Sequence, residues 1–374
     1  MSGPRVAVVG SGVAGASTAF ALAAGGAEVV VVDRVLPGQA TAAGAGIIQP
    51  WSSGADGSTY ELYAAGAAYY PTLIERLAAV GVSDIGYRVA GSLVVHADAA
   101  KLDDAEELLR RRTAGVAVAG TVGRLSGRDA RALFPPLAPD LGAVHVSGGA
   151  RVDGRLLRSG LLAGARRHGA VMVDAPARLA PAPTGTWAVH TPGGDLGADV
   201  VVVAAGAWVN SVLEPLGHRL AVEPQRGQIA HLLLEGRESA DWPSVLPLAS
   251  HYIVPFDAGR IVVGATRETG SGFDARLTAG GVLEVLSNAL SVAPGLAAAS
   301  LIETRVGLRP LAGEHGPFLG PLADHPTLFV NAGFGPAGLT MAPLAGAALA
   351  QLILTGSSDL DLRAFAPPEP SRER

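Results

Sequence analysis

Short apolar runs and alanine-rich stretches alternate at the start of the chain. The β-branched run Arg5–Val9 is typical of a strand buried on both faces. After a glycine-rich turn, residues 14–24 have the composition of a helix, which the glycine pair 25–26 ends. A second apolar run, 28–32, closes on Asp33. The pattern predicts a strand–helix–strand unit with parallel strands and a right-handed crossover.

Apolar runs of the same kind recur far along the chain. Residues 199–203 suit the interior of the first sheet, residues 328–331 are again a buried strand, and residues 171–173 form a further strand. By contrast, residues 91–96 and the strands expected within 221–309 suit a second, mostly antiparallel sheet. We therefore expect two interleaved domains, each assembled from separated segments.

Composition and charge narrow the class of protein. Of the 374 residues, 49% are apolar and 16% are charged, as expected of a chain with a large buried core. The formal charge is −5, and the sequence has no arginine-rich stripe with interleaved aromatic residues. Both observations argue against a nucleic-acid partner. There are no cysteines, so disulfides, thiolate catalysis and a flavin tethered through sulfur are excluded. The 9 histidines are scattered without a carboxylate cluster beside them, and we expect no metal site.

Two segments bear on where the protein works. The first five residues lack a basic stretch and a small-residue cleavage site, so we expect no signal peptide and a cytoplasmic protein. Residues 337–354 are apolar enough to consider as a membrane span. They are interrupted by Thr340, Pro343 and Gln351, which favours a buried helix and no integral membrane segment.

The glycine turn carries the first functional signal. Gly10 permits a tight turn, Gly12 lets the backbone approach a pyrophosphate, and Gly15 lets the helix pack on the strand. The phosphates then lie at the positive end of the helix, and Asp33 is placed to accept hydrogen bonds from ribose hydroxyls. This spacing predicts a dinucleotide site.

The dinucleotide is either a nicotinamide cofactor or FAD. A free nicotinamide cofactor usually occupies one continuous domain, whereas distant segments complete this sheet. The strand at 199–203 leads into the small residues 204–207, which let backbone lie close to a cofactor. The strand at 328–331 leads into the glycine-rich turn 333–338 and a helix whose positive end stabilises an anionic reduced flavin. These features favour FAD.

Five segments in order give the chain a more specific resemblance. It resembles the D-amino-acid oxidase superfamily of FAD-dependent oxidoreductases, in its glycine oxidase and D-amino-acid dehydrogenase-like branch. The matching segments span nearly the whole chain: residues 10–15, 42–48, 204–208, 251–255 with 264–266, and 307–310 with the closing helix.

The resemblance implies a fold and its division. It implies an α/β protein in which a Rossmann-type FAD-binding domain is interleaved with an α+β substrate domain built on a mostly antiparallel sheet. The FAD-binding domain is expected to take residues 1–88, 145–215 and 305–374. The substrate domain is expected to take residues 89–144 and 216–304.

The resemblance also implies site residues. Arg309 matches the arginine that grips the substrate carboxylate, and Tyr252 matches a tyrosine that assists there. Gln49, Trp51 and His251 are expected to line the substrate pocket. Noncovalent FAD is expected to contact Gly10, Ser11, Gly12, Val13, Ala14, Gly15, Asp33, Arg34, Thr41, Ala42, Ala43, Gly44, Ala45, Gly46, Ile47, Ala177, Ala205, Gly206, Trp208, Arg309, Gly333, Gly335, Pro336, Ala337, Gly338, Leu339 and Thr340.

The implied reaction is oxidation of an amino acid or related amine. A hydride passes from the substrate α-carbon to flavin N5, and the imine hydrolyses to a keto acid and ammonia. Glycine oxidases carry a second arginine in the turn before the last helix, but residues 334–337 hold no charge, which favours a substrate other than glycine, such as a secondary amine. Arg267 and Glu268 either add polarity to the site or form a surface pair.

The electron acceptor is either oxygen or a carrier such as a quinone. Some relatives use a lysine above the flavin to assist oxygen reduction. Lys101 is the only lysine here and belongs to a charged helix, which favours a dehydrogenase. Two other functions compete with amine oxidation: a nicotinamide-linked dehydrogenase, and a flavin-binding protein that oxidises no amine.

Overall fold

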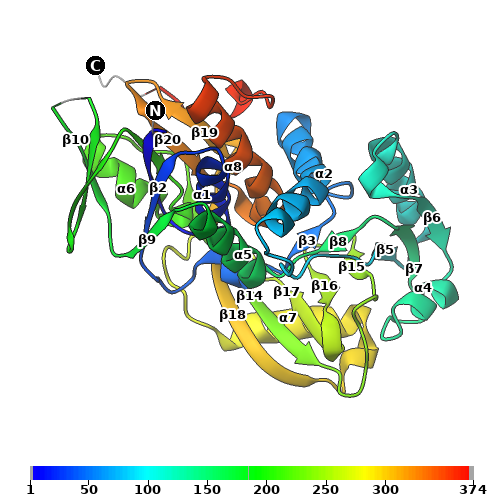
Figure 1. Ribbon diagram of the computed structural model, residues 1–374. Coiled ribbons are helices and arrows are strands. Elements are labelled where there is room, and N and C mark those ends of the chain that lie inside the picture. The colour runs from blue at the N-terminus through cyan, green and yellow to red at the C-terminus, as the bar shows by residue number, and fades with distance from the viewer. Residues whose placement is uncertain (1–2, 184, 370–374) are drawn as a thin grey trace.

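The computed structural model describes residues 3–183 and 185–369. Two large sheets dominate it (Figure 1). The first has six strands in the order β19-β20-β13-β1-β2-β9. Neighbouring strands are parallel, except that the edge strand β19 is antiparallel to β20. Its strands are β1 (Arg5–Val9), β2 (Glu28–Asp33), β9 (Val171–Asp174), β13 (Val200–Val203), β19 (Phe318–Leu322) and β20 (His325–Ala332).

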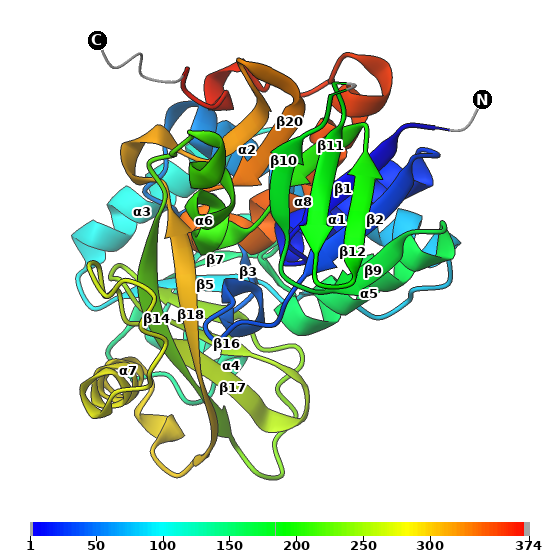
Figure 2. The ribbon, with the colours of Figure 1, turned by 90° about the vertical axis from the view of Figure 1, so that its left-hand side faces the viewer.

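This sheet is buried on both faces, which explains its continuous apolar strands. One face packs against four helices: α1 (Val13–Ala24), α2 (Gly57–Ala79), α5 (Gly154–Arg167) and α8 (Gly338–Thr355). A three-stranded sheet and helix α6 (Val209–Leu213) cover the other face (Figure 2). The strands of that small sheet are β10 (Arg178–Pro181), β11 (Trp187–Thr191) and β12 (Gly194–Ala198).

The second large sheet has eight strands in the order β18-β14-β17-β16-β15-β5-β7-β6. Every neighbouring pair is antiparallel except β15 with β5. Helix α7 (Ala279–Val292) packs on β14 and β17, while α3 (Ala99–Thr113) and α4 (Gly127–Leu133) pack near the other end. The strands are β5 (Ser92–His96), β6 (Val122–Leu125), β7 (Gly142–Val146), β14 (Glu223–Leu233), β15 (Ser244–Pro247), β16 (Tyr252–Pro255), β17 (Arg260–Gly264) and β18 (Ser300–Leu311).

The observed sheets confirm the predicted fold class, a Rossmann-type half and a mostly antiparallel half. Three predicted domain boundaries nevertheless fall inside strands, and the boundary at 88/89 splits the two-residue strand β4 (Arg88–Val89). The boundary at 144/145 cuts β7, and that at 304/305 cuts β18, which pairs with β14 as far as Leu311. The segment 38–50 contains a 3-10 turn at Ala40–Ala43 and β3 (Ile47–Ile48). Strand β3 joins β8 (Ala150–Arg151) and β4 (Arg88–Val89) in a small sheet.

Helix α8 is the apolar segment considered above as a membrane span. Within the described residues, Gly335–Thr355 alone is long and apolar enough for such a span. It packs against α1 and α2, and Ala342, Ala345 and Leu349 have no exposed surface. A Cβ atom at Gly346 would lie 2.7 Å from the backbone nitrogen of Thr18, so glycine permits the close approach to α1. The helix therefore packs as a core element of the nucleotide-binding half.

Candidate active site

A cavity of about 790 Å³ contains the sequence motifs from both halves of the molecule. Its lining runs from the glycine turn after β1, through Trp208, to Tyr252 on β16 and Arg309 on β18. A volume of this size is typical of a site for a small molecule or cofactor.

The glycine turn has the packing that the spacing predicts. Gly10 has a φ of +103°, and a Cβ there would lie 2.5 Å from the Ala204 carbonyl oxygen. A Cβ at Gly15 would lie 1.9 Å from the Gly10 carbonyl oxygen, because α1 packs directly on the turn. Gly12 lines the cavity, and a Cβ there would approach only Thr41 Oγ1, at 3.4 Å. The turn is thus closed by backbone on two sides and open toward the cavity at Gly12.

The positive end of α1 faces this opening. The first turn of the helix holds no acidic residue, and Gly12 offers no side-chain cap. The Val13 N–H donates to Thr41 Oγ1 at 3.0 Å. Free N–H groups and the helix dipole favour an anion here, so the turn fits the pyrophosphate of a dinucleotide.

Asp33 is held against the glycine turn. Its Oδ2 accepts hydrogen bonds from the Ser11 N–H at 3.0 Å and the Ser11 hydroxyl at 2.5 Å. Arg158, from α5, donates from Nε to the Ser11 carbonyl oxygen at 2.6 Å and from its guanidinium to the Ser11 hydroxyl. No sequence pattern indicated Arg158, which holds the turn from 147 residues away. Hydrogen bonding of Asp33 to a ribose stays a prediction.

Most of the predicted cofactor residues line the cavity, and two do not. Gly15 lies behind the turn, where its role is packing. Ala42 lies outside the lining, and its carbonyl oxygen accepts a hydrogen bond from Arg305 at 3.1 Å. Residues in the lining are 10–14, 33–34, 41, 43–47, 177, 205–206, 208, 309, 333 and 335–340.

The closing turn brings a second helix end to the cavity. Helix α8 begins at Gly338 with no acid in its first turn. The Tyr70 hydroxyl donates to the Leu339 carbonyl oxygen at 2.5 Å, and the Thr340 hydroxyl donates to the Ile47 carbonyl oxygen at 3.2 Å. These bonds join the start of α8 to α2 and to the segment 43–47, so the cavity wall is held together across three parts of the chain.

Two glycines make room for the predicted substrate-binding side chains. Arg309 lies over Gly227 on β14, where a Cβ would come within 2.4 Å of the guanidinium. Tyr252 pairs with Gly264 on β17, where a Cβ would lie 3.0 Å from the tyrosine hydroxyl. Arg309 donates to the Thr266 carbonyl oxygen at 3.0 Å and to Gln225 at 3.3 Å. Within the described residues no carboxylate pairs with it, so its charge is available to a ligand.

Burial sets the protonation of this pair. Burial raises the pKa of the Tyr252 hydroxyl, and the nearby cations Arg309 and Arg267 oppose the shift. Burial lowers the pKa of Arg309, and the electrostatic effect of Tyr252 opposes that shift. Arginine stays protonated in proteins and tyrosine keeps its proton near neutral pH. The pair therefore presents a cation and a hydroxyl donor.

The three predicted pocket residues separate into two groups. Gln49 and His251 line the cavity. The Gln49 side-chain oxygen accepts from the Ser52 hydroxyl at 2.9 Å, while its amide nitrogen has no partner within the described residues. Burial lowers the pKa of His251.

Trp51 does not line the pocket, and that prediction is wrong. The chain turns sharply after Pro50, and the indole packs in a cluster with Val94 and Leu109, with 1% of its surface exposed. Arg112, on α3, donates to the carbonyl oxygens of Trp51 and Ser53 and fixes this turn, in which Ser52 and Ser53 line the cavity but Trp51 does not.

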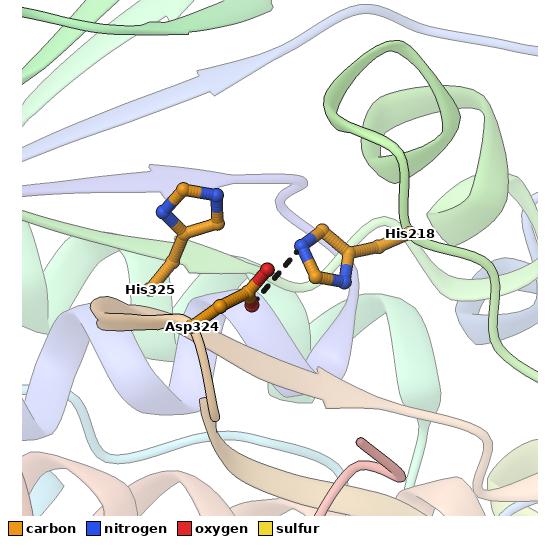
Figure 3. Close-up of side chains that lie close together, drawn as sticks. All are labelled: His218, Asp324 and His325. Atoms are coloured by element: carbon orange, nitrogen blue, oxygen red, sulfur yellow. Dashed lines mark ion pairs between the residues drawn. The ribbon is translucent and has the colours of Figure 1, made fainter. Parts of the chain in front are cut away.

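A histidine–carboxylate cluster lies away from the cavity lining (Figure 3). Candidate ligand atoms of His218, Asp324 and His325 lie within 4.8 Å of one another, although the sequence indicated scattered histidines with no carboxylate cluster beside them. His218 Nε2 is 3.2 Å from Asp324 Oδ1, and the His325 ring packs edge-on against Trp187. Because the three residues join the turn between β19 and β20 to the loop before β14, their proximity arises only in the fold. They contribute nothing to the cavity.

Comparisons with known proteins assign the family. The family of FAD dependent oxidoreductases named DAO matches residues 5–352. An uncharacterized oxidoreductase of Bacillus subtilis is 44% identical over 362 residues, covering 96% of this chain and 97% of the relative. The crystal structure of iminodiacetate oxidase from Chelativorans sp. BNC1 superposes with a TM-score of 0.94 at 46% identity, covering 98% and 100% of the two chains. That of glycine oxidase from Geobacillus kaustophilus superposes with a TM-score of 0.87 at 27% identity, covering 99% of each.

The family match selects FAD over the nicotinamide cofactor that the glycine turn alone left open. Such a cofactor fits the opening of the glycine turn at Gly12, the N-terminal ends of α1 and α8, and the cavity that they line. The chain belongs to the DAO family of FAD-dependent oxidoreductases.

Proposed function

We propose that this protein oxidises the carbon–nitrogen bond of an amino acid or an N-substituted amino acid. One observation carries the proposal. Arg309 and Tyr252, a cation without a carboxylate partner in the described residues and a hydroxyl donor, line the same cavity as the glycine turn. The names of the relatives, glycine oxidase and iminodiacetate oxidase, support amine oxidation over a flavin-binding role without catalysis.

Each residue of the pair acts on the substrate carboxylate. Arg309 binds it through charge-assisted hydrogen bonds, and the Tyr252 hydroxyl donates one more. FAD, held by the glycine turn, the 43–47 segment and the start of α8, supplies the acceptor for a hydride from the carbon beside that carboxylate. Binding the carboxylate at a fixed place orients this carbon, which is the main contribution that a protein makes to such a reaction.

The reaction balances without a catalytic acid or base in the lining beside Arg309. A substrate with a neutral amine loses a hydride from carbon and a proton from nitrogen, which leaves an imine. Water adds to the imine and releases a 2-oxo acid with ammonia, or with an amine when the nitrogen was substituted. The described lining contains a single carboxylate, Asp33, and it is bound to Ser11.

A substituted nitrogen fits this chain better than glycine. The turn at 334–337 holds no arginine, whereas the glycine oxidases that the sequence resembles carry one there. The relative at 46% identity is named for iminodiacetate, in which the nitrogen bears two carbon substituents. We propose a secondary amine as the preferred substrate class.

The proposal is tested by product analysis of the FAD-loaded protein with oxygen. The panel contains glycine, several D-amino acids and several N-substituted glycines. We expect a 2-oxo acid and a free amine in equal amounts from the N-substituted members. If a protein with bound FAD forms no 2-oxo acid from any member, the proposed reaction is wrong.

We propose oxygen as the electron acceptor, because several relatives are named oxidases. The position of Lys101 in the sequence favoured a carrier instead. Lys101 is exposed on α3 and absent from the cavity lining, so oxygen would react without help from a lysine. Stopped-flow mixing of the reduced protein with oxygen decides between them. We expect oxygen to reoxidise the flavin as fast as the enzyme turns over. If reoxidation by oxygen is far slower than the turnover measured with a quinone as acceptor, the carrier is supported instead.

A further inference from the structure

The cavity wall carries an excess of positive charge. Arg34, Arg267 and Arg309 all line it, against the single carboxylate of Asp33. Asp33 accepts hydrogen bonds from Ser11 and from the backbone N–H of Arg34, so it belongs to the glycine turn. Beside Tyr252, the two cations Arg267 and Arg309 act on the same hydroxyl. A single substrate carboxylate leaves one of them without a counter-charge.

The extended segment after β17 explains why Arg267 is free. Side chains alternate along extended backbone, so Thr266 and Glu268 point to one side and Arg267 to the other. The Thr266 hydroxyl donates to Glu268 at 2.7 Å, which places both on the same side. Glu268 is bound there by Arg226 at 2.6 Å and by Gln228 at 2.7 Å. Arg267 and Glu268 therefore form no surface pair, and within the described residues Arg267 has no ion-pair partner.

Two uncharged groups in the same lining also lack hydrogen-bond partners. Gln49 is 3% exposed, and its amide nitrogen has no partner within the described residues. His251 Nε2 is buried and equally unpaired within that part of the chain. Buried polar groups are normally hydrogen-bonded, so unpaired groups on a cavity wall indicate a polar ligand. Each of these two can donate to a carboxylate oxygen.

We propose that Arg267 binds a second carboxylate of the substrate, so that the site selects amines carrying two carboxylates. This deepens the proposed function and rests on it. Arg309 and Tyr252 bind the carboxylate beside the oxidised carbon. Arg267, with Gln49 and His251 as further donors, binds the other. A dianion neutralises both guanidinium groups, of which Arg309 is half-buried and Arg267 is exposed at the cavity wall.

The kinetic test uses pairs of substrates that differ by one carboxylate. Iminodiacetate is compared with N-methylglycine, and D-aspartate with D-alanine, which shows whether the second carboxylate belongs on the nitrogen or on the side chain. For the wild-type protein we expect kcat/KM for the dicarboxylate of at least one pair to exceed kcat/KM for the monocarboxylate of the same pair by about 10²-fold. Arg267→Met should abolish most of this ratio, because it lowers kcat/KM for the dicarboxylate far more than kcat/KM for the monocarboxylate. Arg267→Lys should restore part of it.

A binding test separates the site from the reaction. Oxydiacetate and methoxyacetate carry oxygen in place of the amine and cannot be oxidised in this way, and their binding is followed by the change in the flavin spectrum. We expect Arg267→Met to weaken oxydiacetate binding about 10²-fold and methoxyacetate binding far less. Arg111→Met, at an exposed arginine of α3, should change neither.

The outcomes distinguish the two proposals. Arg267-dependent binding of oxydiacetate supports the second carboxylate site even if no amine is oxidised. Equal binding of oxydiacetate by the wild-type protein and Arg267→Met overturns it, even if amines are oxidised. A wild-type protein that oxidises monocarboxylates as efficiently as dicarboxylates also overturns it.

Discussion

Arg309→Met is expected to raise KM for carboxylate-bearing amines by about 10²-fold or more. A hydrogen bond to a charged group contributes roughly 2–3 kcal/mol, and 1.4 kcal/mol corresponds to a factor of ten in affinity. Burial strengthens the effect here because it shields Arg309 from water, which also lowers the pKa of Arg309. Methionine fills the space over Gly227 but offers no donor. Steady-state kinetics with a mono- and a dicarboxylate measures the change.

The control for this variant is Arg309→Lys, which keeps the charge and loses the paired geometry. We expect its KM to lie between those of the wild-type protein and the methionine variant. Both variants should bind FAD and unfold at temperatures close to the wild type, since the partners of Arg309 within the described protein are few: Thr266, Gln225 and Tyr252. Unchanged KM for all carboxylate substrates in a folded Arg309→Met protein excludes the assigned role.

Gly12→Val is expected to weaken FAD binding by about 10²-fold, or ~2.7 kcal/mol, while the protein still folds. The backbone of Gly12, with φ −61° and ψ 179°, suits any residue, and a Cβ there meets only Thr41 Oγ1 at 3.4 Å. The added methyl groups instead project into the lining where the pyrophosphate approaches. Fluorescence titration of the FAD-free protein with FAD measures the dissociation constant.

Gly15→Ala provides the contrast, because its Cβ would overlap the Gly10 carbonyl oxygen at 1.9 Å. This variant should lower the unfolding temperature even without FAD. Gly12→Val should not, so a comparison of the two FAD-free proteins separates a cofactor contact from a packing contact. Wild-type affinity for FAD in Gly12→Val contradicts the placement of the pyrophosphate at this turn.

The sequence predicted the features that depend on neighbouring residues. The apolar runs 5–9 and 28–32 identify buried strands, and the spacing of Gly10, Gly12 and Gly15 identifies the turn between strand and helix. These features are local, because a strand buried on both faces must be apolar throughout and a tight turn needs glycine.

Features that depend on distant contacts were missed or misplaced. Trp51 follows the 42–48 segment directly, but a turn held by Arg112 on another helix removes it from the pocket. Arg158 reaches Ser11 only because α5 packs on α1. The orientation of Arg267 depends on the distant contact between Glu268 and Arg226 on β14. The end of β18 at Leu311 likewise depends on its pairing with Glu223.

The central claim is that a carboxylate-bearing amine bound at Arg309 and Tyr252 reduces the FAD of this cavity. Anaerobic mixing of the FAD-loaded protein with N-substituted glycines tests it most directly, followed by the visible absorbance of the oxidised flavin. We expect at least one N-substituted glycine to remove that absorbance completely within the turnover time. In Arg309→Met the loss should be much slower at the same substrate concentration. An unchanged spectrum with every member of the panel, in a protein that holds a full complement of FAD, would contradict it.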